Sequence, residues 1–104
     1  MKKLIRDGKV AVLYSPEYGA GWYTWSSESN PECLFDSDIV ELVLAGASAK
    51  AIEDAARAKW PDFYAGGVRN LTVAWVPVGT SFRVNEYDGY ETIEIMGEVD
   101  WVVA

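Results

Sequence analysis

The sequence predicts a single α+β domain, in which an antiparallel sheet of about five to six strands carries two short helices on one face. A mixed sheet is left open as an alternative. Strand-like segments lie towards both ends of the chain and helix-like segments lie between them. Two Asp-Gly dipeptides, at residues 7–8 and 88–89, each separate two strand-like runs. The 104 residues suit one modest core, and neither a repeat nor a linker divides them, so residues 1–104 form one predicted domain.

The first predicted elements are a hairpin and a central strand. Residues 3–6 and 9–12 flank Asp7-Gly8, a dipeptide that suits a two-residue type I′ turn. Residues 10–14 are apolar on both faces of an extended segment, as in a strand that is covered on each side. Pro16 has no N–H to give to a neighbouring strand, so we expect this central strand to end just before it.

A glycine-rich aromatic loop comes next. Gly19 and Gly21 allow positive φ and close backbone approach just before Trp22, Tyr23 and Trp25. Two interpretations stay open: a binding loop whose amides and aromatic faces meet a ligand, or a turn into a strand whose aromatics fill the core or cover an edge. The loop lacks the third glycine of a dinucleotide fingerprint and the Gly-Lys-Ser/Thr of a P-loop.

Two helices are predicted in the middle of the chain. Asp38 and Glu41 have the spacing of a capping box, so the first helix should begin there and run to about residue 45. Ser48 can cap a second helix over residues 49–59, where apolar positions recur at i, i+4 and i+8. Its small alanines allow close packing on a sheet.

The second hairpin is the clearest local signal, because Asp88-Gly89 fixes its register. This register sets apolar residues opposite each other on one face, and Arg83 opposite Glu94 on the other. It also sets Glu86 opposite Glu91 at the end of the core-facing row, where like charges are unfavourable unless they lie in solvent or hold a cation. The remaining predictions are a loop at residues 64–70 and strands at residues 71–76 and 98–104.

Charge limits the classes of partner. Nine basic and sixteen acidic residues give a net charge of −7. An acidic surface repels phosphate backbones, so we expect no direct nucleic-acid binding, whereas a basic protein partner would be attracted. The N-terminal residues offer neither a signal-peptide apolar core nor a membrane span, so we expect a cytoplasmic protein that does not associate with membranes.

The residue types exclude several chemistries. The chain has no histidine and one cysteine, Cys33, which excludes histidine-dependent triads, zinc sites of the usual Cys/His type and an internal disulfide. Asp36, Asp38 and Glu41 resemble spaced oxygen ligands, but helix capping accounts for them better. We therefore expect no metal and no cofactor, and the sequence favours a protein that is not an enzyme.

The candidate site combines the aromatic loop with the tip of the second hairpin. Trp and Tyr anchor many interfaces, and this chain has five Trp and six Tyr. We expect a binding protein that docks a protein partner, or a second copy of itself as a homo-oligomer. The alternative is a small-molecule site or a minor enzyme activity in residues 18–25, helped by nearby carboxylates. The expected binding residues are Tyr18, Gly19, Gly21, Trp22 and Tyr23, with Glu86, Asp88 and Glu91 as a charged rim.

Four runs of the sequence resemble a family of small hypothetical proteins from bacteria and their phages. They are residues 9–16 (KVAVLYSP), 19–23 (GAGWY), 32–36 (ECLFD) and 39–43 (IVELV). The resemblance covers most of the chain and implies a bacterial cytoplasmic setting and a mobile-element origin. The family has no known activity, so it implies no catalytic or binding residue. Small acidic phage proteins often work by binding a host protein, which agrees by analogy with the expected protein partner.

Overall fold

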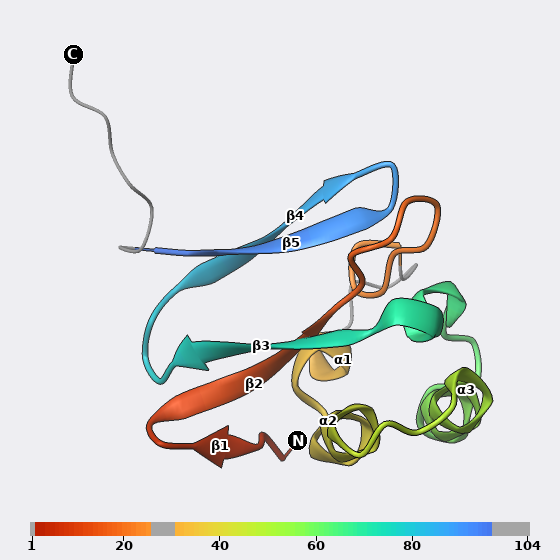
Figure 1. Cartoon of the computed structure of the whole chain (residues 1–104), viewed down its shortest axis with the longest axis horizontal. Helices are drawn as coiled ribbons and strands as arrows, with labels where there is room; N and C mark the ends of the chain where they lie inside the picture. The colour runs from red at the N-terminus through yellow and green to blue at the C-terminus, as the bar shows by residue number, and fades with distance from the viewer. Residues whose placement is uncertain (1, 26–30, 97–104) are drawn as a thin grey trace.

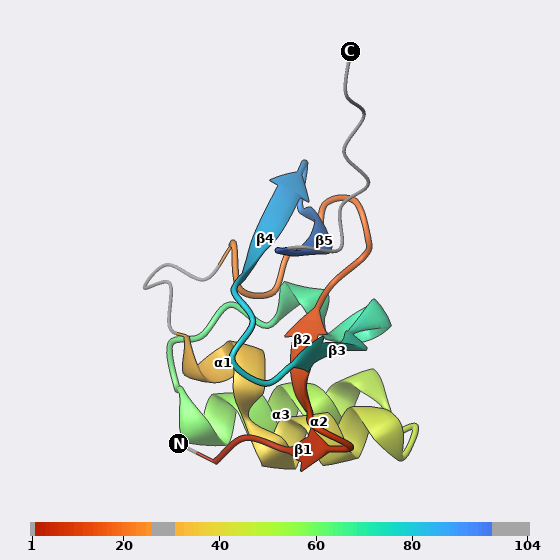
Figure 2. The same ribbon diagram turned by 90° about the vertical axis from the view of Figure 1, so that its left-hand side faces the viewer.

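The chain folds into three stacked layers, as the computed structural model shows for residues 2–25 and 31–96 (Figure 1). Helices form one outer layer, a three-stranded sheet lies in the middle, and a two-stranded hairpin forms the other outer layer (Figure 2). The elements in chain order are β1 (Ile5–Arg6), β2 (Lys9–Tyr14), α1 (Glu32–Phe35), α2 (Ser37–Leu44), α3 (Ala49–Lys59), the 3₁₀ helix η1 (Gly66–Asn70), β3 (Thr72–Pro77), β4 (Phe82–Tyr87) and β5 (Tyr90–Ile95).

The middle sheet is antiparallel and has the order β1-β2-β3. Asp7 and Gly8 have φ angles of 51° and 75°, so the predicted turn between β1 and β2 is confirmed. β2 is the central strand, as predicted. Ala11 and Leu13 belong to the core cluster under the helices, and Val12 belongs to the cluster under the hairpin. The two apolar faces of β2 are therefore covered by different layers.

The helical layer contains both predicted helices and two elements that were not predicted. Asp36 is the N-cap of α2, rather than Asp38, because its carboxylate accepts hydrogen bonds from the N–H groups of Asp38 and Ile39. Ser48 caps α3, as predicted, by accepting a hydrogen bond from the N–H of Ala51. The one-turn helix α1 and the 3₁₀ helix η1 were not predicted.

The β4–β5 hairpin has the predicted register, from Phe82 opposite Ile95 to Tyr87 opposite Tyr90. It does not extend the middle sheet. Its apolar face packs over β2 and β3 instead, in the second core cluster. The prediction of a single sheet of five to six strands is therefore not confirmed: the described strands form one sheet of three and one of two. The strand predicted at residues 98–104 lies outside the described residues.

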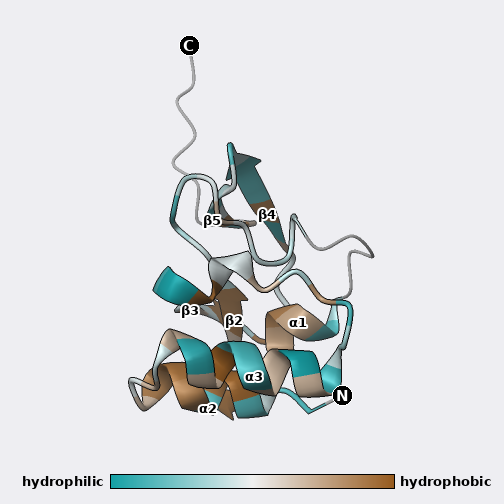
Figure 3. Ribbon diagram, turned by 90° about the vertical axis from the view of Figure 1, so that its right-hand side faces the viewer, coloured by the Kyte–Doolittle hydropathy of each residue, from teal (hydrophilic) through white to brown (hydrophobic). Residues whose placement is uncertain are grey.

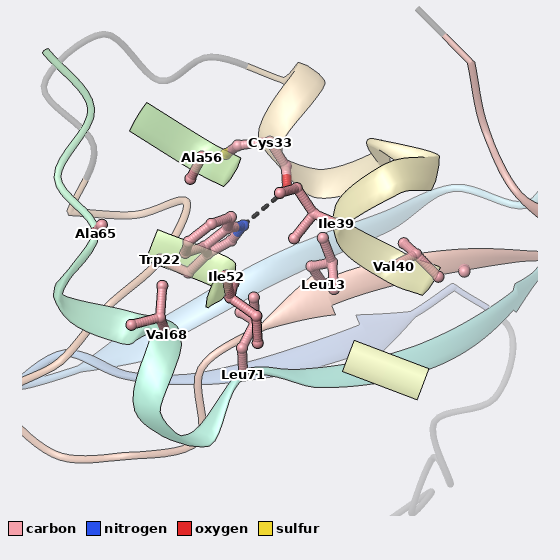
Figure 4. Packing of buried hydrophobic residues seen from close by; sticks show 11 residues of the cluster. Leu13, Trp22, Cys33, Ile39, Val40, Ile52, Ala56, Ala65, Val68 and Leu71 are labelled. Carbon is pink, nitrogen blue, oxygen red and sulfur yellow. Dashed lines mark hydrogen bonds between the residues drawn. The ribbon is translucent and has the colours of Figure 1, made fainter. Parts of the chain in front are cut away.

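The larger core cluster fills the space between the helices and the sheet (Figure 4). Trp22 is fully buried there, its ring centroid lies 4.7 Å from that of Phe63, and its indole N–H donates a hydrogen bond of 2.7 Å to the Cys33 carbonyl. Ile39 from α2 and Ile52 from α3 belong to the same cluster. Colouring by hydropathy shows hydrophobic segments on β2 and α2 and hydrophilic bands on α3 (Figure 3).

Candidate interaction surface

The structure brings the aromatic loop and the tip of the second hairpin together, although they lie far apart in the sequence. The loop of residues 15–25 leaves the end of β2 and runs beside the turn between β4 and β5 (Figure 1). The N–H of Gly19 donates to the carbonyl of Asp88 (2.6 Å), and the N–H of Glu91 donates to the carbonyl of Ser15 (2.8 Å). We call this contact between the loop and the hairpin tip the loop–hairpin junction.

The carboxylate of Glu91 is buried inside the loop–hairpin junction, with none of the residue exposed. Its Oε1 accepts a hydrogen bond from the N–H of Ser15 (2.9 Å). Its Oε2 accepts from both the N–H (2.8 Å) and the hydroxyl (2.6 Å) of Thr24. Among the described residues, no lysine or arginine forms an ion pair with Glu91. These three hydrogen bonds therefore offset the cost of burying the carboxylate.

The like-charge pairing expected between Glu86 and Glu91 is relieved by their different surroundings. Both sit at the predicted register, but Glu91 points into the junction while Glu86 is exposed. Oε2 of Glu86 accepts hydrogen bonds from the N–H of Gly89 (2.6 Å) and from the indole N–H of Trp25 (3.3 Å). No cation is needed to hold the pair, because backbone, hydroxyl and indole donors serve both side chains.

Glycines allow the loop to approach its neighbours this closely. A Cβ on Gly89 would lie 2.8 Å from the N of Ala20 and 2.8 Å from Cζ2 of Trp25. A Cβ on Gly21 would collide with the Trp25 side chain, and a Cβ on Gly67 of η1 would collide with the carbonyl oxygen of Gly21. The loop is therefore wedged between η1 and the hairpin turn, with no room for side chains at these positions.

Three tyrosines gather on the face of the hairpin that points away from the Glu91 side chain. We call these residues, Tyr18, Tyr87 and Tyr90, the tyrosine cluster. The ring centroid of Tyr18 lies 4.9 Å from that of Tyr90 and 6.3 Å from that of Tyr87, the latter at an interplanar angle of 84°. Tyr18 is 66% exposed and Tyr87 is 77% exposed. Exposed tyrosine rings are suited to an interface, because each combines a large apolar surface with a polar hydroxyl.

An acidic residue borders the tyrosine cluster. Asp88 is exposed in the turn that follows Tyr87, and no described residue forms an ion pair with it. This end of the molecule therefore carries an unpaired negative charge next to aromatic rings.

Beyond the tyrosine cluster, the outer face of the hairpin carries an ion pair. Nε of Arg83 lies 2.7 Å from Oε2 of Glu94, and the amide of Asn85 donates to the same oxygen at 2.7 Å. The hydrogen bond from Arg83, followed by that from Asn85, lowers the pKa of Glu94, and the same ion pair raises the pKa of Arg83. The charge of Arg83 is thus matched locally by Glu94 and does not offset that of Asp88.

The predicted binding residues divide into buried and exposed groups. Trp22 and Glu91 are fully buried, so they support the surface from within instead of forming part of it. Tyr23 is half-buried and packs against both core clusters. The predicted residues that lie at the surface or shape its loop are Tyr18, Gly19, Gly21, Glu86 and Asp88.

Tyr87 and Tyr90 were not among the predicted binding residues. The signal for them was nevertheless present, because the hairpin register already set Tyr87 opposite Tyr90 on the face away from the core. The binding role of all these residues stays a prediction.

Neither known proteins nor metal-binding or membrane-spanning features of the described residues indicate a further function. No protein-family model, curated protein or solved structure matches the chain. The resemblance to small hypothetical bacterial and phage proteins therefore stays a prediction. Within residues 2–25 and 31–96, no three cysteine or carboxylate side chains are grouped so as to hold a metal ion. None of the helices in these same ranges is both long and apolar enough to span a bilayer.

Proposed function

We propose that this chain is a small, acidic, non-enzymatic binding protein of bacterial or phage origin, which docks a protein partner through the tyrosine cluster. The observation that carries the proposal is the pair of strongly exposed rings, Tyr18 and Tyr87, at a junction that is otherwise closely packed. Tyrosines combine a large apolar ring with a polar hydroxyl, which is why they are enriched at protein interfaces.

The interior of the loop–hairpin junction supports the proposal, because its hydrogen bonds hold the backbone of the loop that carries Tyr18. Glu91 holds the loop at Ser15 and at Thr24, on either side of Tyr18. The hydrogen bond from Gly19 to Asp88 ties the middle of the loop to the turn. A surface that is ordered by folding loses less conformational entropy on association than a mobile loop would.

Charge favours a protein over a nucleic acid as the partner. Asp88 stands beside the tyrosine cluster, and the whole chain has a net charge of −7. A phosphate backbone would be repelled from this surface. The alternative, a small-molecule site or minor enzyme in residues 18–25, has no specific observation in its favour, because both oxygens of Glu91 already accept hydrogen bonds from the chain.

Affinity capture from a nuclease-treated bacterial lysate, followed by mass spectrometry, tests the proposal. The wild-type chain is compared with Y18A/Y87A, which removes two exposed rings and no core side chain. The matched control is I5S/V78S, which changes two other exposed apolar residues, 54% and 55% exposed, at the opposite end of β2. We expect a stoichiometric partner that is retained by I5S/V78S and lost by Y18A/Y87A.

Two further readouts make the result decisive. Circular dichroism must show that both double variants remain folded. A partner that is captured equally by Y18A/Y87A would place the binding surface elsewhere and contradict the proposal. Concentration-dependent mass of the purified wild type, lost in Y18A/Y87A, would instead identify the partner as a second copy of the chain.

A further inference from the structure

We propose that the partner segment which binds the tyrosine cluster carries arginine, and that its guanidinium group stacks on the exposed tyrosine rings while it pairs with the carboxylate of Asp88. This inference rests on the proposed function, and it adds the chemistry of the partner. It is argued from two properties of the surface: its exposed rings and its unpaired negative charge.

The rings of the tyrosine cluster are open to a cation. Tyr18 and Tyr87 are exposed by 66% and 77%, and their planes are nearly perpendicular, so a flat group can lie on one ring and meet the edge of the other. Elsewhere the chain covers aromatic rings with its own cations. Lys3 lies 4.4 Å from the centroid of Phe35, and Arg6 lies 5.9 Å from that of Trp75. Among the described residues, no such cation covers the tyrosine cluster.

The charge around these rings is complementary to a cation. Asp88 is exposed in the hairpin turn, and no described residue forms an ion pair with it. Arg83, on the same face of the hairpin, is occupied by Glu94. An incoming cation therefore meets a carboxylate that has no competing partner, and the chain's net charge of −7 attracts it from a distance.

Arginine fits this combination better than lysine. Its guanidinium group is planar, so its face can stack on a tyrosine ring while its edge donates hydrogen bonds to carboxylates. The ammonium group of lysine is a compact, strongly hydrated charge that cannot make both contacts at once. We therefore expect the surface to discriminate between the two cations, which attraction by net charge alone would not do.

The test is a titration of the full chain with three capped pentapeptides that differ only in side-chain chemistry. They are acetyl-Gly-X-Gly-X-Gly-amide with arginine, lysine or the neutral isostere citrulline at X. Binding is followed by the amide NMR shifts of Gly19 and Asp88, which report on the junction directly. We expect saturable shifts with the arginine peptide, an affinity about two- to fivefold weaker with lysine, and no saturation with citrulline.

Variants with equal changes in charge distinguish binding at the tyrosine cluster from attraction by the net charge of the protein. Asp88→Asn keeps a residue type that tolerates the positive φ of 50° at this position. Asp54→Asn, on the exposed face of α3, makes the same charge change far from the cluster. We expect D88N and Y18L to weaken the arginine peptide, and D54N to leave its affinity unchanged.

The outcomes distinguish this inference from the function on which it rests. Equal weakening by D88N and D54N, or equal affinity for the arginine and lysine peptides, would reduce the effect to net charge and overturn the inference. If the arginine peptide causes no saturable shift while lysate capture still depends on Tyr18 and Tyr87, the inference fails and the proposed function stands. If lysate capture is also independent of these tyrosines, both fail.

Discussion

The two faces of the middle sheet are covered by different physical means. On the helix side, a large apolar cluster surrounds the buried Trp22. On the hairpin side, a smaller apolar cluster is supplemented at the loop end by the hydrogen bonds of a buried carboxylate, Glu91. Apolar burial is non-directional, whereas hydrogen bonds to a carboxylate fix distances and directions. We therefore expect the helix side to supply most of the stability and the hairpin side to set the position of the tyrosine cluster.

Replacing Trp22 by alanine should produce the largest effect, because it tests the helix side. The variant would leave a cavity between the sheet and α3 and would remove the hydrogen bond to the Cys33 carbonyl. We expect a loss of about 3–5 kcal/mol in the free energy of unfolding, measured by urea denaturation. A loss of less than about 1 kcal/mol would contradict the assignment of most stability to this cluster.

Replacing Glu91 by glutamine tests the hairpin side. The amide NH₂ group must then face the N–H of either Ser15 or Thr24, so two donors meet in a buried site. We expect a loss of about 1–3 kcal/mol, with faster amide hydrogen exchange in residues 15–25. Glu41→Gln, at an exposed position of α2, is the matched control. Equal stability of the two variants would show that the hydrogen bonds of Glu91 do not hold the junction.

Two glycines with nearly the same backbone conformation isolate the close contact at the hairpin tip. Gly89 has φ of 84° and Gly79 has φ of 82°, but only a Cβ on Gly89 would meet Ala20 and Trp25. Both alanine variants carry the strain of positive φ. We expect G89A to lose about 1 kcal/mol more than G79A in the free energy of unfolding, because the loop must shift. Equal losses would mean that the loop can move away from the added Cβ of G89A at no cost in free energy.

The smallest effect is expected where α3 ends beside the start of α2. Nζ of Lys59 lies 3.2 Å from Asp36 and 2.9 Å from Asp38. The hydrogen bond from Lys59 lowers the pKa of Asp38 below its ordinary 3.8, and the bonds to Asp38 and Asp36 raise the pKa of Lys59 above its ordinary 10.5. The stabilisation from these ion pairs is therefore fully present between pH 3.8 and pH 10.5. It is lost below this range as folded Asp38 gains a proton, and above this range as folded Lys59 loses one.

Thermal unfolding of Lys59→Met across pH checks this linkage. The variant should unfold at a slightly lower temperature than the wild type at neutral pH, since exposed ion pairs contribute little. The difference should shrink as the pH falls from 3.8 through the lowered pKa of Asp38, because the carboxylate is then neutral in both folded and unfolded chains. A difference that stays constant over this range would contradict the assignment.

Signals that depend on neighbouring residues predicted the local structure. Asp88-Gly89 set the hairpin register, and Ser48 caps α3 as its position indicated. The arrangement of the sheets could not be predicted in the same way. The alternating pattern of β4 and β5 shows which face is apolar, but the same face can line a shared core or cover another sheet. Here it covers Val12 and Val76, which lie in other strands.

The candidate site was predicted as a location but not in its details. The aromatic loop and the hairpin tip were expected to act together, and the structure places them in contact. Burial was not predictable, because an aromatic residue after a glycine turn has the same pattern whether it enters the core, as Trp22 does, or faces solvent, as Tyr18 does. Glu91 is buried because Ser15 and Thr24 supply its donors, and no sequence spacing reveals that pairing.

The pairing of β2 with β3 has a consequence for the order in which the chain folds. Tyr14 pairs with Thr72, so this pairing closes a loop that contains α1, α2 and α3, whereas β4 and β5 are joined by a two-residue turn. Closing a long loop costs more entropy than forming a hairpin, so we expect β4–β5 to gain protection first in pulse-labelled hydrogen exchange. A folding intermediate that holds only this hairpin would display Tyr87 and Tyr90 without Tyr18. The complete tyrosine cluster then exists only in the fully folded chain, so under the proposed function partially folded chains would not compete for a partner.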